Sequence, residues 1–459
     1  MCCLDGEGFH TALRSPLTKR PARRTFMRQM FQALVIAGII VVVFFFGRDM
    51  VSPSNVATID MGDIDLLQSS LCSNHSQQQQ QQRLTTTTTS SQGARRVLSE
   101  YDMAQHLQPE TSPDQFIPPA TWQRHAVRGA LYMVIRNENL QDARAAMRSV
   151  EDRFNKHYQY PWILLNNQDF SPTFRKFIRK VTDAPIFFGK TDMAAWDYPS
   201  WIDIPLAENK ILDMTFRTAL HMGGSLSFRK MLRYQSGLFI HHPLFRDVDY
   251  VWRVEPGAEY SCDMEFDPFR FMKNHNKTLG FAITMRESYD SIPTLWSTTR
   301  DFMEEHPEHL LQANETIMPW ITDDLRSEYN MCHIWSNFEI VETSFLRSKA
   351  YQDYFSYLDR KGGFFYERWG DAPVRTLAAA MFLPRNKLQF FDRIGYSHSV
   401  ANHCPVNPAF NQKCSCDKFD TYDLHPDSCT SDLLSYIDQA TRDEMISFAN
   451  SVAQEKAQQ

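Results

Sequence analysis

The stretch Val248-Asp-Tyr-Val-Trp-Arg-Val-Glu-Pro256 decides the predicted fold, because it is a strand-like run that ends on one carboxylate and one proline. Its β-branched and aromatic residues favour a strand, and proline is excluded from the interior of a sheet. In an open α/β sheet, ligands bind in the crevice beyond the carboxyl ends of the strands. Glu255 therefore stands where a carboxylate is well placed to hold a metal ion.

A strand, helix and strand pattern upstream predicts an α/β sheet of the nucleotide-binding type. The apolar run Leu131–Ile135 is followed by helical periodicity over 140–154 and then by Tyr160-Pro-Trp-Ile-Leu-Leu-Asn166. Residues 134–137 leave the first strand at its carboxyl end, so we expect them near a nucleotide. Arg136 is accordingly a candidate ligand-binding residue, with an ordinary solvated loop charge as the alternative.

Four further elements complete the expected mixed sheet flanked by helices. One helical pattern begins at Lys210 and stops at Gly223-Gly224. Two further helical patterns cover residues 264–274 and 298–313. A strand is predicted over Leu279–Met285.

The 459 residues include 43% hydrophobic residues, enough to bury a large core, and we assign residues 121–459 to one catalytic domain. The net charge of −6 gives no indication of a nucleic-acid partner.

An uncharged apolar run over residues 30–47 follows five basic residues between Lys19 and Arg28. Its length suits a thin bilayer, and the flanking charge keeps residues 1–29 cytoplasmic, so a type II transmembrane signal anchor is predicted. A cleaved signal peptide is the alternative, but the run is long for one and no convincing cleavage site follows.

Residues 48–120 are predicted to form a lumenal stem, because Gln, Thr, Ser and Pro tracts cannot bury a core. The Thr/Ser tract is either O-glycosylated or a bare spacer. Three N-glycosylation sequons follow the anchor, at Asn74, Asn276 and Asn314.

Nine cysteines divide between the two sides of the predicted membrane. Cys2 and Cys3 are cytoplasmic, where they are either palmitoylated or part of an uninformative tail. In an oxidising lumen we expect disulfides among the seven cysteines that follow the anchor. Because seven is odd, at least one of them has no partner in the chain. Cys414-Ser-Cys416 favours disulfide partners over zinc, since its spacing is short and no second pair follows. The lumenal set is Cys72, Cys262, Cys332, Cys404, Cys414, Cys416 and Cys429.

The segment Gly362–Pro373 packs two acids, an arginine and several aromatic residues into twelve positions. Aromatic faces stack on sugars, and carboxylate and guanidinium groups bind hydroxyls or phosphate. Glu367, Arg368 and Asp371 are therefore binding candidates, with Trp369 as a wall. A buried ion-pair network that fixes the fold is the alternative for the same residues.

Four ordered blocks of the sequence are Tyr250–Pro256, Trp335-Ser-Asn-Phe-Glu-Ile340, Tyr366-Glu-Arg-Trp-Gly-Asp-Ala-Pro373 and Ile394-Gly-Tyr-Ser-His398. These blocks resemble the fungal Golgi α-1,2-mannosyltransferases, which form glycosyltransferase family 15. The similarity runs from about Leu131 to Cys404 and also includes Tyr160–Asn166 and Arg233-Tyr-Gln-Ser-Gly237. It implies a GT-A-like sheet, a Golgi membrane location with the catalytic domain in the lumen, and assembly with other Golgi mannosyltransferases.

The resemblance also implies a reaction, the Mn²⁺-dependent and retaining transfer of mannose from GDP-mannose to a terminal mannose of a glycoprotein or glycolipid. Glu255 and His398 match the metal-binding positions of the family, and Mn²⁺ accepts both carboxylate and imidazole ligands. Asp263 is a lesser metal candidate. Glu339 matches the carboxylate at the anomeric centre, as a nucleophile, an acceptor-orienting group or a stabiliser of the transition state. Its alternative is a buried ion pair with an arginine such as Arg253.

One departure from the family pattern leaves other functions open. Phe228 stands where the family usually has tyrosine, so a phenolic hydroxyl is absent near the site, and Leu232 stands where cysteine is common. Mannosylphosphate transfer, in which the acceptor attacks phosphorus, is an enzymatic alternative. An inactive lumenal homologue that binds mannan or organises complexes is the alternative from another class.

Overall fold

The computed structural model describes residues 116–218, 220–322 and 328–458. The predicted tail, the predicted anchor and nearly all of the predicted stem lie outside these residues, so that organisation stays a prediction. Across the described ranges, none of the helices combines the length and the apolar character that crossing a bilayer requires.

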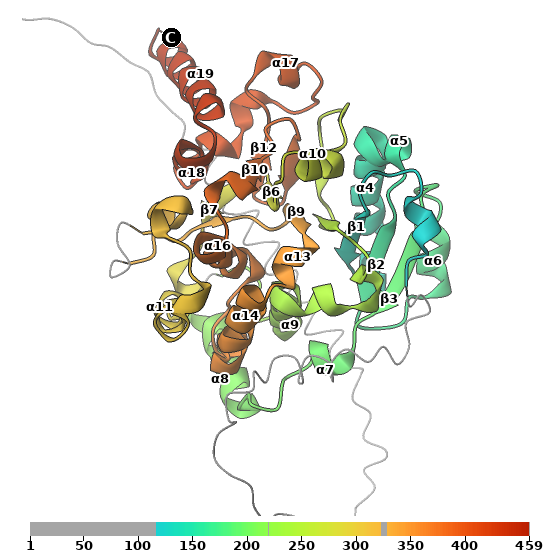
Figure 1. Cartoon of the computed structure of the whole chain (residues 1–459), viewed down its shortest axis with the longest axis vertical. Helices are drawn as coiled ribbons and strands as arrows, with labels where there is room; N and C mark the ends of the chain where they lie inside the picture. Colours follow the sequence, from blue (N-terminus) through green and yellow to red (C-terminus); the bar gives the residue numbers. More distant parts are fainter. Residues whose placement is uncertain (1–115, 219, 323–327, 459) are drawn as a thin grey trace, which may run out of the picture. The chain divides into compact units, whose positions relative to one another are not determined.

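A mixed seven-stranded sheet forms the centre of the domain, as predicted, with strand order β10-β6-β9-β4-β1-β2-β3 (Figure 1). Strands β3, β2, β1 and β4 run parallel, whereas β9 is antiparallel to both β4 and β6. The strands are β1 (Gly129–Val134), β2 (Trp162–Asn166), β3 (Ile186–Lys190), β4 (Tyr250–Val254), β6 (Leu279–Phe281), β9 (Phe338–Glu342) and β10 (Leu388–Phe390).

Strand β4 is the middle of this sheet, and all five of its residues are buried. Because side chains alternate along a strand, Trp252 enters the core on one face while Val251 enters the core on the other. Burying an aromatic side chain of this kind contributes about 1.5–3 kcal/mol. Arg253 points to the same face as Val251, and it is one of the few buried charges of the sheet.

Helices cover both faces of the sheet. Helix α4 (Leu140–Val150) lies between β1 and β2 in the sequence, so the strand, helix and strand prediction is confirmed. The other helices are α5 (Lys156–Tyr158), α6 (Pro172–Ile178), α7 (Met193–Trp196), α8 (Ile204–Arg217), α9 (Leu226–Arg233), α10 (Pro268–Asn274), α11 (Leu295–Glu305), α12 (Met318–Ile321), α13 (Thr343–Leu346), α14 (Lys349–Lys361), α15 (Gly363–Tyr366), α16 (Asp371–Phe382), α17 (Pro408–Asn411), α18 (Thr430–Ile437) and α19 (Gln439–Gln458).

Four predicted boundaries are corrected. Helix α8 begins at Ile204, before the predicted start at Lys210, because Pro205 and the Asp203 cap start it there, and it ends at Arg217, before Gly223. Helix α10 begins only at Pro268, because the carboxylate of Asp267 caps it by accepting a hydrogen bond from the Arg270 amide. Helix α11 ends at Glu305, and 3-10 turns replace the rest of the predicted helix over 298–313. The predicted strand over Leu279–Met285 is broken after Phe281, so its second half, β7 (Thr284–Arg286), pairs instead with β8 (Cys332–Ile334).

A small antiparallel sheet joins β5 (Glu259–Tyr260), β11 (Tyr396–His398) and β12 (Ala401–His403). Strand β5 follows β4 after only a short turn, in which Gly257 adopts a φ of +80° that glycine accepts without strain. This sheet therefore carries His398 towards the chain that leaves β4.

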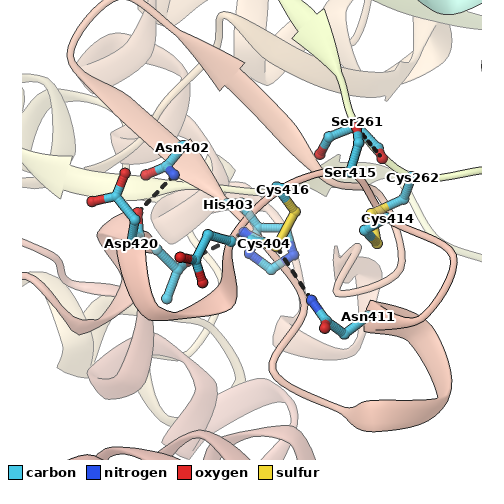
Figure 2. Close-up of a disulfide and its surroundings, with 12 residues drawn as sticks. Ser261, Cys262, Asn402, His403, Cys404, Asn411, Cys414, Ser415, Cys416 and Asp420 are labelled. Atoms are coloured by element: carbon cyan, nitrogen blue, oxygen red, sulfur yellow. Dashed lines mark hydrogen bonds between the residues drawn. A yellow bond between two sulfur atoms is a disulfide. The ribbon is translucent and has the colours of Figure 1, made fainter.

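Three disulfides join Cys262 to Cys414, Cys332 to Cys429 and Cys404 to Cys416. Figure 2 shows the first and the third of these bonds. The prediction of disulfide partners for Cys414 and Cys416 is confirmed, and their partners lie 152 and 12 positions away, respectively. These bonds use all six cysteines of the described residues, and Cys72 lies outside them. The absence of a cysteine at position 232 therefore leaves no described cysteine unpaired.

Two of the three sequons lie in the described residues. Asn276 and Asn314 are both exposed, and Asn276 has a positive φ of 54° at the turn after α10. Asn74 lies outside the described part of the chain.

We expect the Cys332–Cys429 bond to contribute more stability than Cys404–Cys416, because it closes a separation of 97 residues instead of 12. Loop-closure entropy predicts losses of about 5 and about 3 kcal/mol, respectively, when each pair is replaced by alanine. Urea unfolding of the two double variants under oxidising conditions measures both values. Equal losses, or the reverse order, would contradict the expectation.

A buried histidine lies beside the Cys404–Cys416 bond. His403 Nδ1 is 2.7 Å from Asp423 Oδ2, and Nε2 is 3.1 Å from the backbone oxygen of Asp392. Burial alone would lower the pKa of His403, but Asp423 and Asp392 together raise it to about 9. The imidazolium is therefore the form that the folded protein holds at neutral pH.

This raised pKa predicts a loss of stability in alkali. A histidine whose pKa is higher in the folded state stabilises the fold fully below its ordinary pKa of 6.5, and that contribution disappears as the pH rises to about 9. The free energy of unfolding should fall by up to about 3 kcal/mol across this window. In His403→Asn, most of this fall in the free energy of unfolding with pH should disappear. His425→Asn, at a more exposed histidine, should keep the fall.

Candidate active site

A cavity of about 390 Å³ opens beyond the carboxyl ends of β1, β2 and β4, where the sequence predicted a ligand site. Arg136 lines it after β1, and Glu255 lines it after β4. Arg136 has only a long contact of 3.8 Å with Glu138 and is 40% exposed, so its guanidinium can turn towards a ligand. The remaining lining residues include Val134, Ile135, Asn139, Asp142, Asn166, Asn167, Trp196, His221, Met222, Ser227, Phe228, Met231 and Pro256.

Glu255 is held at the edge of this cavity by the strand that precedes it. Its Oε1 accepts a hydrogen bond of 2.5 Å from Arg253 Nε, and its side chain keeps 14% of its surface exposed. This contact uses one carboxylate oxygen, which leaves Oε2 available to a ligand.

His398 lies next to the same segment. Its Nε2 is 3.2 Å from the backbone oxygen of Pro256, and its Nδ1 is 2.9 Å from Asn337 Nδ2. The structure therefore brings the imidazole to the residue that follows Glu255, although the two are 143 positions apart in the sequence. The side chains border different openings, however, because His398 lines a second cleft and Glu255 lines the first cavity.

This pair suits a manganese ion. One carboxylate and one imidazole are donors that Mn²⁺ accepts, and the phosphate oxygens of a bound nucleotide would complete its coordination. Asn337 Nδ2 donates a hydrogen bond to His398 Nδ1, and Nε2 donates to the backbone oxygen of Pro256, so the ring must give up one of these two contacts to bind a metal ion. Asp263, the lesser candidate, is instead paired with Arg153 at 2.6 Å and lines neither opening.

A buried network of charges connects Glu255 to Glu339. Arg253 donates hydrogen bonds to Glu255, to Ser336 and to the carboxylate of Asp371. Ser336 Oγ donates to the same Asp371 oxygen at 2.6 Å, and Arg375 Nη1 is 3.9 Å from it. Arg375 in turn forms a salt bridge with Glu339, so that five charged side chains lie in one chain of contacts.

Glu339 is 1% exposed, and its partner is Arg375 instead of the Arg253 that the sequence suggested. Burial raises the pKa of Glu339, in spite of the two arginines, whereas those arginines hold the pKa of Asp371 below its ordinary value against the effect of burial. Glu339 Oε2 has no hydrogen-bond partner among the described residues. The carboxyl lies behind the cavity and is not one of its lining residues.

The residues of the Tyr366–Pro373 block serve mainly as structure in this conformation. Glu367 accepts hydrogen bonds from Thr294 and from the indole of Trp369, at 2.7 and 2.6 Å. Trp369 is 1% exposed and packs against Gly363, where a Cβ atom would lie only 2.1 Å from the ring. Its indole is therefore part of the core and forms no wall of either opening.

Arg368 and Asp371 also have internal partners. Arg368 donates to the backbone oxygen of His221 at 2.6 Å and contacts Glu287 at 3.2 Å, and it lies over the ring of Phe228. Asp371 belongs to the buried network described above. The alternative weighed from the sequence, an ion-pair network that fixes the fold, thus describes most of what this block does.

Phe228 lines the cavity, so the departure from the family pattern falls at the site itself. Two further residues, Arg375 and Asn337, were missed by the sequence analysis. Arg375 lies four positions after Asp371, a spacing that places both on one face of a helix, and this signal could have been used. Asn337 lies within the Trp335–Ile340 block that carries the resemblance, but the sequence indicated no role of its own for it.

The model of the glycolipid 2-alpha-mannosyltransferase family matches residues 74–438. The chain belongs to this family and is therefore a glycosyltransferase of the mannosyltransferase class. The match begins within the predicted stem and covers the whole of the site described above.

Curated relatives support this assignment. The chain is 43% identical over 305 residues to glycolipid 2-alpha-mannosyltransferase 2 of Candida albicans, a match that covers 66% of each chain. It is 42% identical over 308 residues to O-glycoside alpha-1,2-mannosyltransferase homolog 3 of Schizosaccharomyces pombe, covering 66% of this chain and 81% of the relative.

Solved structures share the fold. The Mn/GDP form of core-mannan synthase A (CmsA/Ktr4) from Aspergillus fumigatus has a TM-score of 0.64 and 32% identity, and covers 77% of this chain and 93% of its own. The mannosyltransferase Ktr4p from S. cerevisiae in complex with GDP has a TM-score of 0.65 and 30% identity, with 83% and 100% covered.

Removing Arg375 should destabilise the domain, because Arg375→Met leaves Glu339 and Asp371 buried with one guanidinium fewer. Breaking a buried ion pair from one side typically costs about 3–5 kcal/mol. Arg217→Met is a matched control, since Arg217 is 77% exposed and its pair with Asp213 should contribute less than about 1 kcal/mol. Denaturant unfolding compares the two variants, and equal effects would show that the network carries little stability.

Proposed function

We propose that the protein is a retaining α-1,2-mannosyltransferase that moves mannose from GDP-mannose to a terminal mannose of N-linked or O-linked glycans or glycolipids. The observation that carries this proposal is Glu255 at the mouth of the β4 cavity, with His398 bonded to the next residue. The relatives named above support it, since one solved relative is described with Mn and GDP and another with GDP.

Glu255 and His398 are the residues that would hold Mn²⁺. The ion would neutralise the negative charge that develops on the departing diphosphate. Arg136 lines the same cavity after β1, the strand beside β4, and its guanidinium can bind phosphate oxygens or sugar hydroxyls. Together these groups favour departure of GDP and orient the donor.

Glu339 has a supporting role in this proposal. Retention needs either a carboxylate nucleophile or attack from the face that the diphosphate leaves, with the acceptor proton passing to a phosphate oxygen. Because Glu339 is buried, paired with Arg375 and not among the lining residues of the cavity, we favour the second route. Glu339 then acts as a positioning residue, since the network that contains it also holds Glu255.

We further propose a Golgi location, with residues 30–47 as a type II anchor and the described domain in the lumen. The three disulfides support an oxidising compartment. Two candidate functions remain beside the main one. Mannosylphosphate transfer would use the same donor site, and Phe228 at the cavity favours an inactive homologue that binds mannan.

Transfer of radiolabelled mannose from GDP-mannose to methyl α-mannoside by the purified full chain tests the proposal. We expect transfer that EDTA abolishes, and Glu255→Ala and His398→Ala should lower kcat/KM by roughly 100-fold or more, since each removes a metal ligand. Mn²⁺ binding measured by electron paramagnetic resonance should weaken in the same two variants. Glu265→Ala and His157→Ala, at surface positions away from the cavity, are the matched controls.

The other outcomes separate the alternatives. A product that retains phosphate would identify mannosylphosphate transfer. Binding of GDP-mannose without any transfer would identify the inactive homologue. Full activity of Glu255→Ala with unchanged Mn²⁺ binding would overturn the metal site.

A further inference from the structure

The cleft lined by His398 is larger than the cavity lined by Arg136 and Glu255, which we call the donor cavity. The cleft has no role in the function proposed so far. Its volume is about 930 Å³, towards the upper end of the roughly 300–1,000 Å³ typical of ligand sites. Its walls come from the turn after β4, the β11–β12 hairpin, residues 419–426 and helix α19.

One end of this cleft adjoins the donor cavity. Glu255 and Pro256 line the cavity, while the next residue, Gly257, lines the cleft. His398 lines the cleft as well, and its Nε2 contacts the backbone oxygen of Pro256. A short piece of chain therefore separates the two openings, so a molecule in the cleft lies beside the metal-binding residues.

The chemistry of the cleft suits a carbohydrate. Phe419 is 60% exposed, so aromatic surface is available to the C–H faces of sugars. Tyr422 and His425 also line the cleft, and their rings stack on each other with centroids 5.1 Å apart. The carboxylates of Glu259 and Asp420 are exposed, and neither has a side-chain partner among the described residues. Ionised carboxylates accept strong hydrogen bonds from hydroxyl groups.

The aromatic and acidic groups are held in place by the hairpin. Asn402 donates from Nδ2 to the backbone oxygen of Asp420 at 2.7 Å (Figure 2), and its Oδ1 accepts from the Tyr422 amide at 3.0 Å. The Cys404–Cys416 bond fixes the same segment. The cleft is thus built on supported backbone and is not a gap between loose loops.

The far wall of the cleft lies beyond the stretch that the family model matches. The family match ends at residue 438, and α19 begins at Gln439. Helix α19 contributes Ala449, Val452 and Ala453 to the cleft. A ligand that extends along the cleft therefore reaches residues outside the stretch that defines the family.

We propose that this cleft binds the mannose units that precede the terminal one in an oligosaccharide acceptor, and so selects extended mannan chains over single sugars. The inference rests on the proposed mannosyl transfer. The terminal mannose would occupy the end beside Gly257 and His398, and the preceding units would lie over Glu259, Asp420 and Phe419 towards α19.

Kinetics with acceptors of two lengths test this proposal on the purified full chain. We expect kcat/KM for linear α-1,2-mannotriose to exceed that for methyl α-mannoside. Phe419→Ala should lower the ratio of the two values by roughly two- to tenfold, the scale of one aromatic contact. Phe116→Ala is the matched control, because Phe116 is 53% exposed and lines neither opening.

A second variant guards against a folding defect. Ala453→Trp narrows the cleft without removing a packing contact, since Ala453 is exposed on α19. This variant should lower the ratio of kcat/KM for mannotriose to kcat/KM for methyl α-mannoside. Equal kcat/KM for both acceptors, or a ratio that neither variant changes, would overturn the cleft proposal while leaving the transfer reaction intact.

Binding separates the two hypotheses if no transfer is found. Saturation-transfer NMR with mannotriose detects occupation of the cleft without turnover. A signal that Phe419→Ala removes and Phe116→Ala keeps would support the cleft and reject the transferase. The absence of both transfer and binding would reject both.

Discussion

The buried network of charges between Glu255 and Glu339 is the constraint on which the rest of the site depends. Arg253 and Arg375 meet three carboxylates where little water enters, and such charges are tolerated only when each keeps its partners. Arg253 belongs to the middle strand of the sheet and binds Asp371 of α16. Arg375, one turn further along the same helix, binds Glu339 of β9, so the two pairs fix α16 against the sheet. The position of Glu255 at the cavity is therefore set by the core as well as by the turn that follows β4.

Much of this arrangement could be predicted from the sequence. Apolar β-branched and aromatic runs indicate strands, and ligands of an open α/β sheet bind beyond the carboxyl ends of those strands. The β4 run, its terminal carboxylate and the pattern of β1, α4 and β2 predicted both the mixed sheet and the edge that carries the cavity. What failed was the assignment of side chains to solvent or core. Trp369 has the residue type of a sugar platform, but the small Gly363 beside it lets the indole sink into the interior.

The remaining errors concern contacts between distant segments. Glu339 and Arg375 are neighbours only because the fold brings a residue of α16 to a residue of β9, and no local pattern indicates that pairing. The break in the 279–285 strand has a similar origin, since β6 and β7 join different sheets. The approach of His398 to Pro256 also depends on a second sheet whose strands are short, and the family resemblance, not periodicity, suggested it.

The three disulfides have a topological consequence for the covalent structure. The Cys262–Cys414 bond closes a covalent loop that contains every peptide bond between these two residues. The Cys332–Cys429 bond closes a second loop, which also contains the peptide bonds from Cys414 to Cys429. A single cut by a protease anywhere from Cys262 to Cys429 therefore yields two fragments that stay joined as one molecule. After a single cut between Cys262 and His398, reduction is also needed to release the segment that carries His398 from the strand that precedes Glu255.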